Sequence, residues 1–202
     1  MNKFFFTLLL ILPFVVNAQI QVQPFFGSDG LQVGTLINKP FSKKENWNYY
    51  NYTSYFTEYN NVETSELESY QNVSRSLYKN LGFNVGATFG NSTLIPALGL
   101  SYIFENENLN FSIFPSVNYL TVEKEVGFDL NSMFEYTQDI SLSWSLYSLI
   151  IFNADYFDSE LVSKEYVRLG LEYKNAIQFG VGSDIDNNEG TFNFGGFVGY
   201  QF

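Results

Sequence analysis

From residue 81 to the C-terminus, apolar and polar side chains alternate along most of the chain. In the clearest stretch, residues 81–89, the odd positions hold Leu, Phe, Val, Ala and Phe, and the even positions hold Gly, Asn, Gly and Thr. A period of two places these sets on opposite faces of a β-strand, whereas a helix needs a period of about 3.6. The same pattern predicts strands at residues 98–104, 109–119, 126–136, 140–146, 167–173, 177–181 and 192–202.

The two faces of these strands indicate a membrane barrel. The polar face is mostly Gly, Ser and Asn, which cover a water-exposed sheet poorly but fit the crowded interior of a closed barrel. The apolar face would then meet lipid. The stretch 109–119 matches the roughly 9 to 11 residues of a tilted membrane strand. Aromatic residues near strand ends are expected to form interfacial girdles: Phe104, Tyr119, Tyr136, Phe152, Tyr166 and Tyr173.

We therefore expect an all-β fold, a closed antiparallel up-and-down transmembrane β-barrel. A soluble secreted all-β binding protein is the alternative. The number of strands depends on the region before residue 81. Strands at 30–38 and 68–78 would give about ten, with the Tyr-rich segment 39–67 as one long outer loop. Alternatively, the capping-box spacing of Ser65 and Glu68 starts a helix that ends at Gly82, leaving eight strands and an N-terminal helical or irregular extension. We favour ten strands.

The first eighteen residues have the organisation of a secretory signal peptide. A short basic start is followed by an apolar run at residues 4–16 and by the small-residue exit Val16-Asn17-Ala18. The apolar run is too short for a membrane-spanning helix, which needs roughly 20 residues. We expect cleavage before Gln19 and a single barrel domain over residues 19–202.

The C-terminal segment carries the most specific family signal. The chain ends in Phe202, with an aromatic Tyr200 two positions earlier and the apolar Val198 two before that. With this ending, the chain resembles the small, porin-like outer-membrane β-barrel proteins of Gram-negative envelopes. The resemblance implies insertion into outer-membrane lipid, with both termini in the periplasm, short periplasmic turns and longer outer loops. It also implies that Val198, Tyr200 and Phe202 form the assembly signal read by the barrel-assembly machinery.

The amino-acid composition excludes most types of catalytic site. The chain of 202 residues contains no Cys and no His, which excludes thiol nucleophiles, thiolate zinc sites and histidine bases. Twenty-one acidic residues against ten basic ones give a net charge of −11, which repels a phosphate backbone. Residues 184–190 begin like a calcium loop but lack its glycine and glutamate spacing. We expect no enzymatic activity, no cofactor, no metal site and no nucleic-acid partner.

A few charged residues lie on the polar face, which otherwise consists mostly of Gly, Ser and Asn. They predict a network of charged side chains inside the lumen. A three-residue turn at 174–176 would place Glu172 opposite Gln178 and Arg168 opposite Gly182, where the missing side chain leaves room for the guanidinium. Buried charges need partners. The predicted lumen charge network is Arg168, Glu172, Lys174, Asp184, Glu135 and Asp129. It is either structural or a charged constriction for a small solute.

Within the segment 39–67, residues 47–59 contain seven aromatic residues interleaved with Asn and Thr, without an apolar face for lipid. We expect it to form an outer-loop binding surface: Trp47, Tyr49, Tyr50, Tyr52, Tyr55, Phe56 and Tyr59. The sequence thus favours a non-enzymatic integral outer-membrane barrel whose outer loops bind an unknown partner or surface. A narrow pore for small solutes is the first alternative function.

Overall fold

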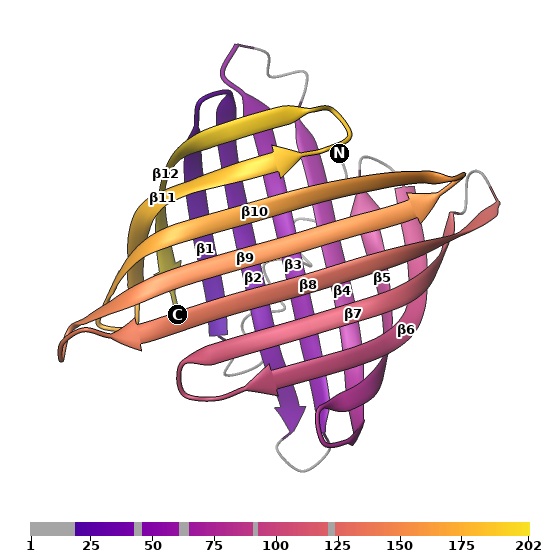
Figure 1. The fold of residues 1–202 in the computed structure, drawn as a ribbon, viewed down its shortest axis with the longest axis horizontal. Helices are drawn as coiled ribbons and strands as arrows, with labels where there is room; N and C mark the ends of the chain where they lie inside the picture. The colour runs from indigo at the N-terminus through magenta and orange to yellow at the C-terminus, as the bar shows by residue number, and fades with distance from the viewer. Residues whose placement is uncertain (1–18, 43–45, 61–64, 91–92, 121–123) are drawn as a thin grey trace, which may run out of the picture.

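The computed structural model describes residues 19–42, 46–60, 65–90, 93–120 and 124–202. The predicted signal peptide lies outside these residues. Each strand pairs antiparallel with the next one in sequence, and β1 pairs with β12, so the sheet closes into a barrel (Figure 1). The strands are β1 (Gln19–Gly27), β2 (Gly30–Ser42), β3 (Trp47–Glu58), β4 (Glu66–Tyr78), β5 (Leu81–Gly90), β6 (Thr93–Glu105), β7 (Leu109–Leu120), β8 (Glu125–Asp139), β9 (Trp144–Phe157), β10 (Glu160–Tyr173), β11 (Ile177–Asp186) and β12 (Thr191–Gln201).

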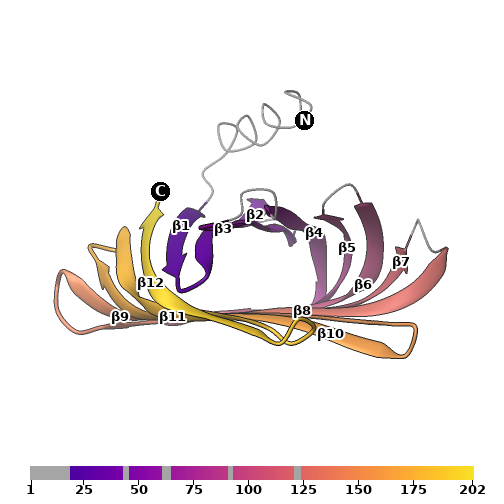
Figure 2. The same cartoon turned by 90° about the horizontal axis from the view of Figure 1, so that it is seen from above.

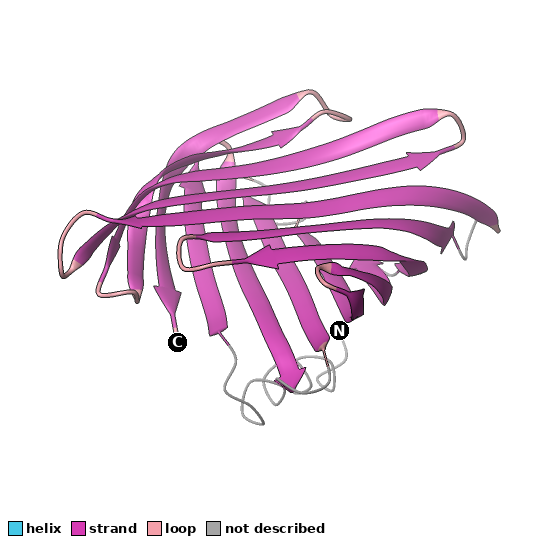
Figure 3. Ribbon diagram, turned by 60° about the horizontal axis from the view of Figure 1, so that its bottom comes forward, coloured by secondary structure: helices cyan, strands magenta, loops and turns pink. Residues whose placement is uncertain are grey.

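The predicted all-β class and the closed up-and-down topology are confirmed. In the part of the chain that the structure describes, every element is a strand, joined mostly by tight turns (Figure 3). No helix within these residues is long and apolar enough to cross a membrane. The alternation from residue 81 onward also points the expected way, with Leu98, Leu100 and Val181 exposed on the outside and Asn84 and Ser101 buried inside.

The predicted number of strands is wrong: the barrel has twelve strands, not ten or eight. The helix proposed from Ser65 and Glu68 does not form, because residues 66–78 are strand β4. The two strands that the sequence analysis missed are β1 and β3. Strand β1 directly follows the predicted cleavage site, and β3 runs through the segment expected to be one long outer loop, so that loop does not exist as predicted.

Strand β3 was missed because each of its two faces mixes aromatic and polar residues. Its aromatic Tyr50 and Tyr52 point into the barrel core, whereas Asn51 and Thr53 lie on the outward face by alternation and are nevertheless buried. These outward polar groups are satisfied laterally: Asn51 Nδ2 donates to Ser69 Oγ at 3.3 Å, and the Thr53 and Ser69 hydroxyls are 2.7 Å apart. Because Trp47, Tyr49 and Tyr55 share the outward face with these polar residues, neither face of β3 is uniformly apolar, and this concealed the strand.

The barrel is flattened rather than round. Strands β1 to β4 form one layer and β8 to β11 another, and the two layers cross steeply (Figures 1 and 2). Strand β12 curves around one edge and β5 to β7 around the other. At the first edge, Gly195 lies so close to β1 that an added Cβ would collide with the carbonyl oxygen of Phe26. A glycine is required there, because the strands approach without room for a side chain.

Because the layers are close, side chains fill the space between them. A core cluster occupies the lumen: Phe25, Leu36, Tyr50, Tyr52, Tyr70, Phe114, Met133, Tyr147, Leu149, Ile151, Tyr166 and Phe197. The ring centroids of Tyr50 and Phe114 are 5.4 Å apart, as are those of Tyr52 and Tyr166. Tyr166 was expected in an interfacial girdle but belongs to this core instead. The lumen is thus a packed core crossed by aromatic rings.

The connections fall into two sets. Both chain ends, β1 at Gln19 and β12 at Gln201, lie at one end of the barrel, here called the termini end. The opposite end is where β1 is followed by β2, β3 by β4, β5 by β6, β7 by β8, β9 by β10 and β11 by β12. The connection between β9 and β10 is only a turn at 158–159, because these strands pair up to Phe157 and Glu160. Most of the residues that we expected in loops therefore belong to paired strands.

Candidate functional site: an acidic vestibule

Two cavities open at the barrel end opposite the termini. Their volumes are about 270 and 330 Å³, and they share the lining residues Glu66, Glu68 and Lys164. We call the two cavities together the vestibule. Its acidic lining residues are Asp29, Glu58, Glu66, Glu68, Asp155, Asp184, Asp186 and Glu189. Among the described residues that line it, Lys164 is the one basic side chain. The vestibule is thus strongly negative, with eight carboxylates against one ammonium group.

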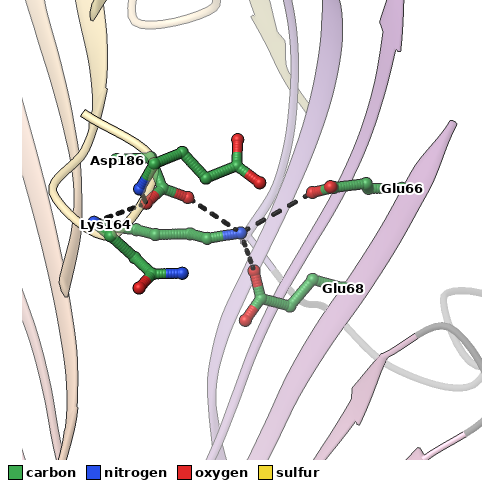
Figure 4. A network of polar contacts seen from close by, with 6 residues as sticks. Glu66, Glu68, Lys164 and Asp186 are labelled. Carbon is green, nitrogen blue, oxygen red and sulfur yellow. Dashed lines mark hydrogen bonds and ion pairs between the residues drawn. The ribbon is translucent and has the colours of Figure 1, made fainter. Parts of the chain in front are cut away.

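Lys164 lines both cavities, and its ammonium lies among three carboxylates (Figure 4). Its Nζ lies 3.5 Å from Asp186 Oδ2 on the paired strand β11. It also reaches across to β4, to 3.6 Å from Glu66 Oε2 and 4.0 Å from Glu68 Oε2. These are long ion pairs between partly exposed groups, each of which contributes at most about 1 kcal/mol. Lys164 is therefore a loosely held ammonium in a site formed by three carboxylates.

Arg168 lies deeper, at the floor of the vestibule. Its side chain is 3% exposed and pairs with Asp184, while Nη2 donates to Gln32 Oε1 at 2.9 Å. The guanidinium carbon is 3.9 Å from the centroid of the Phe25 ring. The expected register is the observed one, with Arg168 opposite Gly182, where an added Cβ would come within 2.7 Å of Arg168 Cδ. The contacts from Phe25 and Gln32 could not be predicted without knowing that β1 closes the barrel.

The six residues of the predicted lumen network do not form one network. Glu172 belongs to a second group near the termini end, in which Gln178 donates to Glu172 at 2.8 Å and Gln21 donates to Tyr147 Oη at 2.7 Å and to Gln178. Lys174 lies exposed in the turn after β10, over the ring of Tyr173. The remaining predicted members, Asp129 and Glu135, lie on β8 and do not pair with Arg168, which binds Asp184 and Gln32 instead.

The seven aromatic residues of the predicted outer-loop surface are separated by the alternation of β3. Tyr50 and Tyr52 are buried in the lumen, and Phe56 lines the vestibule. Trp47 and Tyr55 lie on the outer face, where Trp47 packs edge-on against Phe83 at 5.9 Å. Tyr49 shares that face by alternation, and Tyr59 is exposed in the connection after β3. These rings do not form a common surface.

The lumen below the vestibule holds little free space. A cavity of about 20 Å³ lies beside Arg168 and Gln32, and one of about 10 Å³ lies beside Tyr52 and Tyr70. Each is close to the volume of a single water site. Within the described residues, no group of three or more acidic side chains is arranged to hold a metal ion. The open, chemically distinctive part of the barrel is therefore the vestibule.

The residues of the expected assembly signal lie at the termini end. Val198 and Tyr200 are exposed on the outer face of β12, and Phe202 follows the strand. The Phe202 amide donates to the carbonyl of Ile20 at 2.9 Å, and its ring contacts Tyr200 with centroids 4.6 Å apart. Their role in assembly stays a prediction.

No family model and no curated protein matches the sequence. Among solved structures, the NanC porin superposes with a TM-score of 0.54 at 11% identity, over 92% of this chain and 98% of that one. OmpT, an outer membrane protein of Vibrio cholerae, gives a TM-score of 0.43 at 10% identity, over 92% and 96% of the two chains. At such identities the likeness to the NanC porin concerns the fold alone: this chain has a porin-like closed β-barrel.

Proposed function

We propose that the protein is an integral outer-membrane β-barrel of a Gram-negative bacterium, exported with cleavage before Gln19. An even number of strands, a closed sheet and an apolar outer face support this placement, because single-chain barrels of bacterial outer membranes combine all three. Both termini would then be periplasmic, and the vestibule would open to the outside. The protein should fractionate with outer membranes and migrate faster on gels before boiling than after it. Recovery in the soluble fraction, with equal mobility before and after boiling, would refute this placement.

We further propose that the vestibule receives small cationic solutes and leads them into a narrow, cation-preferring pathway, without catalysis. The observation that carries this proposal is the lining of the vestibule by eight carboxylates and one ammonium. A concave surface lined by one sign of charge concentrates counter-ions at the opening. The packed aromatic lumen implies that the pathway is closed at rest and opens when rings move, so conductance should be small and intermittent.

Planar bilayers test this function. With a tenfold salt gradient, the reversal potential of the refolded protein should shift toward the cation limit of about 59 mV. Replacing Glu66 and Glu68 by Gln should reduce that shift. The control replaces Asp158 by Asn and Glu160 by Gln, two exposed acids near the same end that do not line the vestibule. Equal selectivity in both double variants would refute the role of the vestibule.

A further inference from the structure

The position of Lys164 suggests which cations the vestibule binds. Its ammonium is held by three carboxylates from two strands on opposite sides of the opening, β4 and β11 (Figure 4). An ammonium carries three N–H donors, and this site offers one carboxylate for each. None of the three distances is as short as the 2.7 to 2.9 Å typical of a tight charged hydrogen bond. The Lys164 side chain thus occupies a site that suits a primary ammonium group, and its contacts there are long.

A metal ion fits this arrangement less well. A divalent cation needs several oxygens converging at about 2.0 to 2.6 Å, whereas the acidic side chains of the described residues form no such group. The carboxylates are instead spread around two cavities with a combined volume of about 600 Å³. That spacing suits an organic molecule that carries its charges on separate N–H donors.

Two buried amide side chains place a second, independent requirement on the ligand. Asn193 is 7% exposed and lines the same cavity as Lys164 and Asp186. Its Oδ1 accepts from the Asp29 amide at 3.0 Å, which fixes the amide orientation, and its Nδ2 has no partner among the described residues. Asn118 lines the second cavity, 5% exposed, with an unpartnered Oδ1. A buried donor or acceptor without a partner is destabilising, so each amide favours a ligand that supplies the missing partner.

We infer that the vestibule binds a small organic molecule with primary ammonium groups and an oxygen acceptor. One ammonium displaces Lys164 from between Glu66, Glu68 and Asp186, and the oxygen accepts from Asn193 Nδ2. Displacement of Lys164 joins the two cavities into one binding space. This inference rests on the proposed cation-binding role of the vestibule and specifies the ligand class.

Lys164 then acts as a tethered competitor, which calorimetry on the refolded barrel in detergent can measure. The probe is bis(2-aminoethyl) ether, and its matched analogue is 1,5-diaminopentane, in which a methylene replaces the oxygen. The Lys164→Met variant should bind the ether at least tenfold more tightly than the wild type. Lys124→Met, which removes an exposed lysine that does not line the vestibule, should bind like the wild type. Equal affinity in the Lys164→Met variant and the wild type would overturn the inference.

The oxygen contact has its own test. The Asn193→Asp variant keeps the oxygen that accepts from the Asp29 amide but loses the N–H donor, so it should lose the preference for the ether over 1,5-diaminopentane. Tetramethylammonium, which has no N–H group, should gain nothing from Lys164→Met. A gain for magnesium without a gain for the amines would overturn the inference in favour of a metal site. If a variant fails to refold, the order of affinities in the wild type, ether above diamine above tetramethylammonium, decides the question.

Binding and conduction fail separately in these experiments. A barrel that binds the ether in detergent but never conducts in bilayers would refute the proposed pathway and leave the ligand class standing. A cation-selective barrel that binds all the probes equally would refute the ligand class and leave the pathway standing.

Discussion

Breaking the ion pair at the vestibule floor should destabilise the barrel unequally, depending on which partner is removed. Arg168 is 3% exposed, whereas the side chain of its partner Asp184 is 12% exposed and borders the vestibule. Asp184→Asn leaves a guanidinium without a counter-charge in the packed lumen. Removing one partner of a buried pair costs about 3 to 5 kcal/mol, and we expect the lower end, about 3 kcal/mol. Three oxygens, from Gln32, Val167 and Ser183, still accept from Arg168.

Arg168→Met should cost less, because the carboxylate left behind can be hydrated from the vestibule. It loses the charge-assisted hydrogen bonds of the guanidinium, but the methionine side chain still packs on Phe25. The double variant leaves no buried charge, so its loss should lie well below the sum of the two single losses. Reversible urea unfolding of the refolded protein in lipid vesicles measures all four free energies of unfolding.

Two results would refute this reasoning. Additive losses would mean that Arg168 and Asp184 do not interact in the folded barrel. A larger loss of stability for Arg168→Met than for Asp184→Asn would mean that water reaches Arg168 from the lumen side. The lumen would then not be packed as described. The control is Lys174→Met, which removes an exposed turn lysine and should change stability by less than about 0.5 kcal/mol.

Three further predictions concern topology, assembly and the lumen. Because the chain has no cysteine, a single introduced cysteine can be labelled selectively. The Lys124→Cys variant should react with an impermeant maleimide on intact cells, and the Lys174→Cys variant only after permeabilisation. The reverse pattern of labelling would mean that the barrel has the opposite orientation in the membrane. Deleting Phe202 should lower the amount of folded barrel in the outer membrane without affecting signal-peptide removal, and a normal yield would exclude it as the assembly signal. Replacing both Tyr52 and Tyr166 by Ala removes a ring pair from the closed lumen and should raise single-channel conductance, and unchanged conductance would show that these rings do not close the pathway.

The class of fold and most of the later strands could be predicted from the sequence, because strand pattern and register are local properties. Alternation assigns each residue of 81–89 to a face regardless of the rest of the chain, and small residues on one face indicate a closed lumen. The short turn at 174–176 likewise determines that Arg168 lies opposite Gly182 and one step from Asp184. These features depend only on the pairing of strands that follow one another in the sequence, so they can be predicted from the sequence alone.

The strand count and the vestibule were decided by the tertiary structure. Alternation separates two faces but does not say which medium each one meets, and in β3 the rings of Tyr50 and Tyr52 turn to the lumen while Asn51 faces outward. Similarly, no local pattern connects Lys164 with Glu66, which lies on a strand six positions away around the barrel. These residues meet because the closed sheet is flattened and its two layers come together at the opening. The binding chemistry of this protein thus arises from barrel closure, which joins charges that are distant in sequence.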